Sequence, residues 1–263
     1  MATLAGSMRT DPDVQAEPRG DTFYAKLAII MALTVVAGFS LQLAMGRSTF
    51  ASPLRVHVHA VLFMGWVAIF VLQSQFATRG PIALHRKLGW LAVGWMFAML
   101  AAAMVVIVAM ARNGTVPFFF TPQHFLIADP LTLLGFMGLT GAAVVLRRDT
   151  EWHARLHISG MAILTGPAFG RIIPMPLLIP YAFEAAGVGS ALFLVAGIVR
   201  DKRRSGAVHP AWWVGLATLV GTLVLARLLA DSAIGDAIYQ AVVAGYPGQA
   251  IAGMAYPAPP PPP

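Results

Sequence analysis

The residues of this chain best able to do chemistry are its seven histidines, because it contains no cysteine. His153 and His157 lie four positions apart in the stretch EWHARLH, so on a helix both imidazoles share one face. The pattern HARL at His153 resembles HRKL at His85. Each pattern follows an apolar segment with a histidine near its far end, His59 in one case and His124 in the other. The two segment pairs are therefore interpreted as a degenerate parallel repeat.

Two stacked histidine pairs on four central helices would suit two haem b groups, because neutral imidazole nitrogens bind haem iron axially. His59 would face His124 in one pair, and His85 would face His153 or His157 in the other. Arginines next to the histidines are candidate partners of the haem propionates. The candidate cofactor-binding residues are His59, His124, His85, His153, His157, Arg86 and Arg155. In plan this layout resembles the cytochrome b561-type electron carriers, which implies electron transfer across the membrane.

A metal site is the second interpretation of the same histidines. His85, His153 and His157 would give three nitrogen ligands and an open position for water, as in a catalytic zinc site. This arrangement loosely resembles membrane zinc hydrolases of the progestin and adipoQ receptor kind, although their Ser and Asp signature is absent. The third interpretation is that no cofactor binds, and that the histidines cap helices and contact lipid headgroups. These three alternatives remain open at the level of sequence.

A second group of ionisable residues is predicted at one level near the opposite side of the membrane. Counting about 1.5 Å per helical residue places them at similar depths on different helices. Ionisable groups in hydrocarbon usually face the bundle and pair with each other, so they predict either a ligand pocket or an ion-pair network. The residues are Asp129, Arg171, Glu184 and Arg227. Pro167, shortly before Arg171, predicts a kink in its helix.

The composition indicates the class of protein that contains these groups. The chain of 263 residues is 58% hydrophobic and 11% charged, with a mean hydropathy of +0.73. Soluble domains carry about a quarter charged residues, so we predict a polytopic membrane protein whose main partner is the lipid bilayer. The net charge of +7 lies in short loops between apolar segments, which argues against nucleic acid. Without cysteine, disulfides, iron–sulfur clusters and thiolate zinc sites are excluded.

The apolar runs predict an all-α fold, a bundle of seven transmembrane helices. The predicted spans are 25–45, 57–77, 82–111, 121–146, 151–173, 181–199 and 211–231. Residues 1–24 are predicted to be a disordered cytoplasmic tail and 25–231 the membrane domain. Residues 232–263 are predicted to be a periplasmic segment with a Pro-rich tail, because YPAPPPPP cannot form a helix.

Lysine and arginine predict the orientation of the bundle. Most of the 18 basic residues fall on one side. They are Arg9, Arg19, Lys26, Arg79, Arg86, Lys87, Arg147, Arg148, Arg155, Arg200, Lys202, Arg203 and Arg204. The opposite side has only Arg47, Arg55 and Arg112. The positive-inside rule therefore places the N-terminus in the cytoplasm and the C-terminus outside.

Two stretches, HRKLGWLAVG and DTEWHARLHISGMAILTGPAFGRII, resemble a family of bacterial inner-membrane proteins with no assigned activity. The resemblance covers roughly residues 55–230 and implies a bacterial cytoplasmic-membrane location and a shared bundle. It lends no catalytic residue.

The most specific hypothesis is bis-histidine haem b binding and transmembrane electron transfer, with a redox partner or quinone. The alternatives are a non-enzymatic binder or transporter that uses the outer polar layer, and a metal-dependent membrane hydrolase that uses the inner histidines.

The predicted orientation can be tested with fusions at the C-terminus. Because alkaline phosphatase folds only outside the cytoplasm, we expect its C-terminal fusion to be active. A C-terminal fusion to green fluorescent protein should be dark. The reverse pattern of activity and fluorescence would mean an even number of spans.

Overall fold

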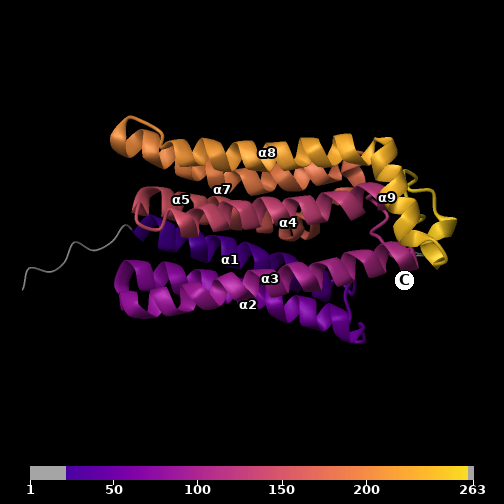
Figure 1. The fold of residues 1–263 in the computed structure, drawn as a ribbon, viewed down its shortest axis with the longest axis horizontal. Helices are drawn as coiled ribbons and strands as arrows, with labels where there is room; N and C mark the ends of the chain where they lie inside the picture. Colours follow the sequence, from indigo (N-terminus) through magenta and orange to yellow (C-terminus); the bar gives the residue numbers. More distant parts are fainter. Residues whose placement is uncertain (1–21, 260–263) are drawn as a thin grey trace, which may run out of the picture.

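The computed structural model describes residues 22–259, and within this range the chain is almost entirely helical. Figure 1 shows the helices packed lengthwise into one bundle. The α-helices are α1 (Thr22–Ala44), α2 (Leu54–Arg79), α3 (Ile82–Asn113), α4 (Pro122–Val145), α5 (Thr150–Leu164), α6 (Gly166–Ile172), α7 (Ala182–Ser205), α8 (Pro210–Ala230) and α9 (Ala233–Val243). Two 3₁₀ turns complete the list, η1 (Met175–Leu178) and η2 (Pro247–Ala250). The all-α prediction is confirmed for the described residues.

Six of these helices are long and apolar enough to cross a membrane, namely α1, α2, α3, α4, α7 and α8. The chain is therefore a multi-pass helical membrane protein. The single helix predicted over 151–173 is instead two helices, α5 and α6, which are separated at Thr165. The Thr165 hydroxyl donates to the Ala162 carbonyl over 2.6 Å, and Pro167 occupies the first turn of α6. A proline has no N–H to donate, so it favours a new helix start at this position.

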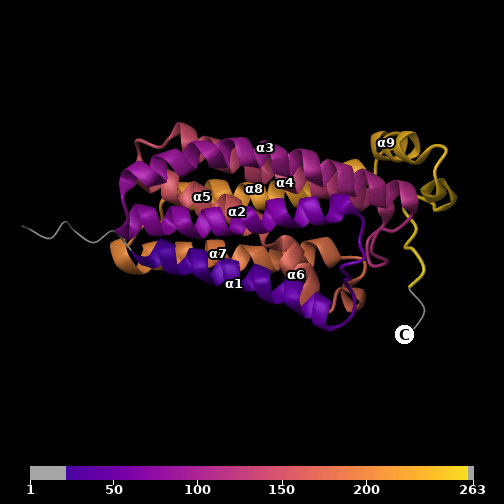
Figure 2. The same ribbon diagram turned by 90° about the horizontal axis from the view of Figure 1, so that it is seen from below.

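The two ends of the bundle differ in charge, and the chain can be followed between them in Figures 1 and 2. The start of α1 and the α2–α3, α4–α5 and α7–α8 loops lie together at one end, which we name the basic end. The other end, named the far end, holds α9 and the last described residues. The basic end contains the loop arginines and lysines that the sequence grouped on one side.

The core forms where α4 and α5 pack against each other and against α8. Phe136, Met161, Leu194 and Trp212, from α4, α5, α7 and α8, are fully or almost fully buried there. Two glycines permit close helix contacts: a Cβ added to Gly38 would lie 2.7 Å from the Ala168 carbonyl oxygen, and one added to Gly160 would lie 2.8 Å from the Thr140 hydroxyl. Membrane helices approach closely at such small residues, and van der Waals contact then holds them together.

The chain after α8 folds back over the far end instead of continuing α8. The Ser232 hydroxyl accepts a hydrogen bond from the Gly235 N–H and so caps the N-terminus of α9. The buried Tyr239 hydroxyl of α9 donates to the carbonyls of Gly248 and Ile251, over 3.1 and 3.0 Å, and burial raises the pKa of this phenol. The Arg112 Nε of α3 donates to the Val242 carbonyl over 3.0 Å. α9 and the segment after it therefore cover the ends of α3 and α4.

Candidate functional site

The inner histidines predicted from EWHARLH and HRKL meet at the basic end. His85, in the first turn of α3, and His153, in the first turn of α5, place their ring centroids 6.1 Å apart at an interplanar angle of 76°. The His157 ring lies one turn further along α5, 4.6 Å from the His153 ring. Two helical hairpins, α2–α3 and α4–α5, thus each contribute imidazole to one cluster.

Hydrogen bonds to the backbone fix the orientation of two of these rings. The Nδ1 of His153 lies 2.8 Å from the Ala143 carbonyl of α4. The Nδ1 of His85 lies 3.3 Å from the Gln73 carbonyl of α2. A carbonyl oxygen can only accept, so each Nδ1 carries the proton and each Nε2 keeps its lone pair for another partner. Bonds of this kind orient most histidines that ligate metals in proteins.

The three histidines do not form a metal-binding group in this structure. Among residues 22–259, no set of three or more His, Cys, Asp or Glu side chains has the geometry to hold a metal ion. Arg86 is exposed beside His85 at the start of α3. The cluster therefore offers two oriented imidazoles, a third ring beside them and one nearby cation.

Arg155, which the sequence predicted as a cofactor partner, is instead bound by two carboxylates. Its Nε and Nη2 donate to the two oxygens of Asp201 on α7, over 2.9 and 3.1 Å, and its Nη1 donates to the Glu151 carboxylate. Arg155 and Asp201 are only 6% and 3% exposed. Such a bidentate pair gives both geometric specificity and strength. Its donors point to α7, so Arg155 acts as a link between helices.

Sequence reasoning missed Asp201, which collects further donors at this site. The Trp212 Nε1 of α8 donates to it over 2.9 Å, and the Arg200 guanidinium over 3.0 Å. Arg200 also lies over the rings of Phe23 and Tyr24 at the start of α1. Helices α1, α5, α7 and α8 thus meet around one carboxylate. The available signal was a single acidic residue inside the basic run VRDKRR.

The polar layer predicted at the opposite level forms two separate clusters. In the first, Arg227 of α8 pairs with Glu184 of α7 over 2.7 Å and also donates to the Pro180 carbonyl over 3.0 Å. The His124 ring packs on Phe183 with their centroids 4.7 Å apart, close enough to Arg227 and Glu184 for their charges to interact. The second oxygen of Glu184 is buried and has no hydrogen-bond partner within the described residues.

The second cluster contains His59 of α2, Asp129 of α4 and Arg171 of α6. The Arg171 charge is close enough to interact with both of the other groups, but no ion pair of 4.0 Å or less joins it to Asp129. One Arg171 nitrogen donates to the Pro167 carbonyl over 2.7 Å, and the guanidinium lies 4.1 Å from the centre of the Phe39 ring. The Arg171 Nε and His59 Nδ1 are buried and have no partner in the described part of the chain.

His59 and His124 are therefore in different clusters. The His59 ring stacks on Phe63 at 4.2 Å and interacts electrostatically with Arg171, whereas His124 contacts Phe183 and faces Glu184 and Arg227. The facing outer histidine pair expected from the sequence does not appear among these contacts.

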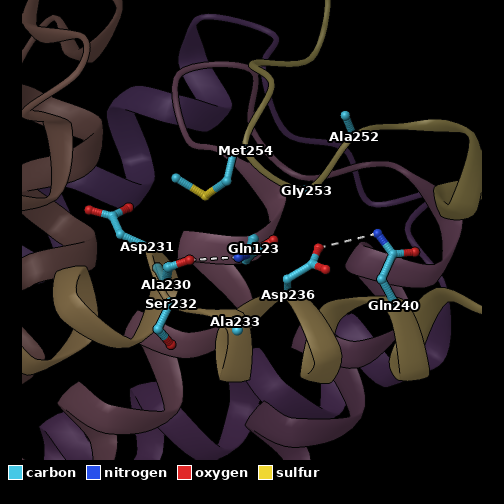
Figure 3. A pocket seen from close by; sticks show the side chains of 10 residues that line it. All are labelled: Gln123, Ala230, Asp231, Ser232, Ala233, Asp236, Gln240, Ala252, Gly253 and Met254. Atoms are coloured by element: carbon cyan, nitrogen blue, oxygen red, sulfur yellow. Dashed lines mark hydrogen bonds between the residues drawn. The ribbon is translucent and has the colours of Figure 1, made fainter.

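A pocket of about 550 Å³ opens at the far end between the α8–α9 junction and the residues after η2. Figure 3 shows Asp231 and Asp236 on opposite sides of Gln123, whose side-chain amide donates to the Ala230 carbonyl over 2.6 Å. Met254 covers one edge. Both carboxylates are exposed, and this pocket contains none of the residues that the sequence singled out.

Comparisons with protein-family models, with curated proteins and with solved structures gave no match.

The buried Arg155–Asp201 pair should dominate stability at the basic end. Replacing Asp201 by Leu leaves the Arg155 charge buried with only the exposed Glu151, and we expect a cost of about 3–5 kcal/mol. The double variant Asp201→Leu/Arg155→Met should recover most of that loss, because no buried charge remains. Apparent melting temperatures of the detergent-purified variants test this expectation.

A matched control for this experiment is Glu184→Gln, which breaks the more exposed Arg227 pair. We expect it to cost about 1 kcal/mol or less. If Asp201→Leu were no more harmful than Glu184→Gln, the Arg155–Asp201 pair would not be the main link between these helices.

Proposed function

We propose that His85 and His153 would hold one haem b at the basic end, and that the protein would use it to exchange electrons with a redox partner or quinone. The observation that carries this proposal is the His85–His153 pair, with centroids 6.1 Å apart and both Nδ1 atoms on carbonyls. Neutral imidazole nitrogens are side-chain donors that hold haem b in proteins, so the chemistry of this pair fits the group.

Residues of this chain would do two things for such a group. The Gln73 and Ala143 carbonyls hold the proton on each Nδ1, which directs each Nε2 lone pair toward a ligand. Arg86 is an exposed cation that can bind a propionate. When bound, haem b supplies one-electron chemistry, and its axial ligands and surroundings set its potential.

The proposal is limited to one haem, because His59 and His124 have different partners in separate clusters. A three-histidine zinc hydrolase site has less support, since the described residues form no metal-ligating group of three. We place the basic end in the cytoplasm of a bacterial cell by the positive-inside rule. A seventh crossing formed by α5 and α6 together fits this orientation, because the chain passes from the basic end to the far end along them (Figure 2).

A visible absorption spectrum of the purified full-length protein tests the haem proposal. After expression with a haem precursor, we expect the bands of six-coordinate haem b, sharpened on reduction. His85→Ala and His153→Ala should each abolish the six-coordinate spectrum, because each removes one axial ligand.

His57→Ala is the matched control, since His57 lies at the far end with its Nε2 near the Phe50 carbonyl. It should leave the spectrum unchanged. A protein that binds no haem, or a spectrum unaffected by either inner substitution, would contradict the proposal. Stoichiometric zinc in the same preparation would favour the metal alternative instead.

A second candidate function is binding or transport of a small polar molecule at the cluster of His59, Asp129 and Arg171. Its specific support is the pair of buried nitrogens without partners, Arg171 Nε and His59 Nδ1. Buried polar groups are almost always satisfied, so such exceptions indicate a place for water or a ligand. A cation and a carboxylate in one cluster suit a molecule that carries both charges, such as an amino acid.

A thermal-shift assay with a panel of L-amino acids tests this second function. A ligand at 100 times its Kd stabilises the folded state by about 2.7 kcal/mol, which gives a clear rise in melting temperature. Arg171→Gln and Asp129→Asn should each abolish that rise, and the control His57→Ala should keep it. A rise that survives both substitutions, or no rise with any amino acid, would argue against a ligand site at this cluster.

A further inference from the structure

A hollow of about 510 Å³ lies on α7 at the basic end, outside both proposed sites. We name it the basic hollow. The residues that line it are Ala196, Val199, Arg200, Arg203 and Arg204. Three arginines and two small apolar residues thus share one surface. One of the three arginines, Arg200, is paired with Asp201, whereas Arg203 is exposed at the surface.

An apolar stripe leads along α7 to this hollow. Val188, Leu192, Val195 and Val199 are 67%, 59%, 46% and 40% exposed, and their spacing places them on one face of the helix. Arg203 follows Val199 by four residues, so its side chain continues the same face. The stretch from Val188 to Val199 rises about 16 Å at 1.5 Å per residue. One leaflet of hydrocarbon is about half of 30 Å thick, so the stripe matches the length of one lipid leaflet.

Contacts within the protein hold the wall of the hollow in place. Arg200 donates to Asp201 over 3.0 Å and lies 4.7 Å from the centre of the Phe23 ring. Arg203 is exposed in the last turn of α7. Ala196, about two turns earlier on the helix, is exposed as well. Arg200 is therefore fixed in the wall of the hollow, and Arg203 is the exposed cation at the end of the apolar stripe.

We propose that the basic hollow binds one anionic phospholipid, with its phosphate at Arg203 and an acyl chain along Val199, Ala196 and Leu192. Charge decides the class of occupant, because arginine binds phosphate strongly and a basic site at a membrane surface selects anionic headgroups. The exposed apolar stripe decides between a lipid and a soluble phosphate, since only a lipid has a chain to cover it. This site is independent of the haem and amino-acid proposals.

The test is a native mass spectrometry titration of the delipidated full-length protein with phosphatidylglycerol, and with phosphatidylcholine of the same acyl chains. We expect tighter binding of phosphatidylglycerol. Arg203→Gln should weaken it about fivefold, the change that about 1 kcal/mol of attraction per arginine produces. Ala196→Trp, which fills the apolar part of the hollow, should weaken it as well.

Arg148→Gln is the matched control, because it removes one exposed arginine charge from the α4–α5 loop at the same end of the bundle. It should change phosphatidylglycerol binding less than twofold if binding at the hollow is specific. Equal binding of the two lipids, or equal weakening by Arg148→Gln and Arg203→Gln, would overturn the proposal. Displacement of the lipid by equimolar inorganic phosphate would also overturn it, because it would identify a phosphate site without a lipid chain.

Discussion

The structure of the basic end depends on the burial of one charged pair, Arg155 with Asp201. Taking two charges out of water is costly, and the cost is recovered only when every donor and acceptor is satisfied. Here the carboxylate accepts from Arg155, Arg200 and Trp212, so α5, α7 and α8 must meet at one point in one register. Lipid gives no hydrophobic drive for helix association, which makes such polar contacts and close packing the main determinants of helix arrangement.

The Arg155–Asp201 pair also positions His153 and His157, which lie on the side of α5 opposite to Arg155. Residues 153 and 157 share one helix face, whereas Arg155, halfway between them, points the other way. When Arg155 is held to α7, His153 must face α4 and α3, where the Ala143 carbonyl and the His85 ring lie. The first turns of α5 thus carry the ion-paired Arg155 on one face and His153, the partner of His85, on the opposite face.

Sequence predicted the elements that apolar length and local spacing determine, and it missed what depends on the rotation of one helix against another. The hydrophobic runs predicted six spans that the structure has, and the spacing of His153 and His157 predicted a shared face. The sequence placed His59 and His124 near the far ends of their segments but could not give the direction in which each side chain points, so their separation into two clusters was not foreseen. Asp201 was overlooked because an acid in a basic run usually lies in solvent, and its burial depends on α5 and α8.

The charged side chains at the two levels of the bundle therefore differ in how completely they are satisfied. At the basic end, Arg155 and Asp201 have well-formed partners, which offset the cost of burying the two charges. At the far level, nitrogens of His59 and Arg171 and one oxygen of Glu184 are buried without partners among the described residues. Unsatisfied groups lower stability, and proteins retain them mainly where function requires them. The break at Thr165 separates α6 from the rotation that Arg155 imposes on α5. α6 is then able to pack on α1 and α7, where the Arg171 guanidinium lies over the Phe39 ring of α1.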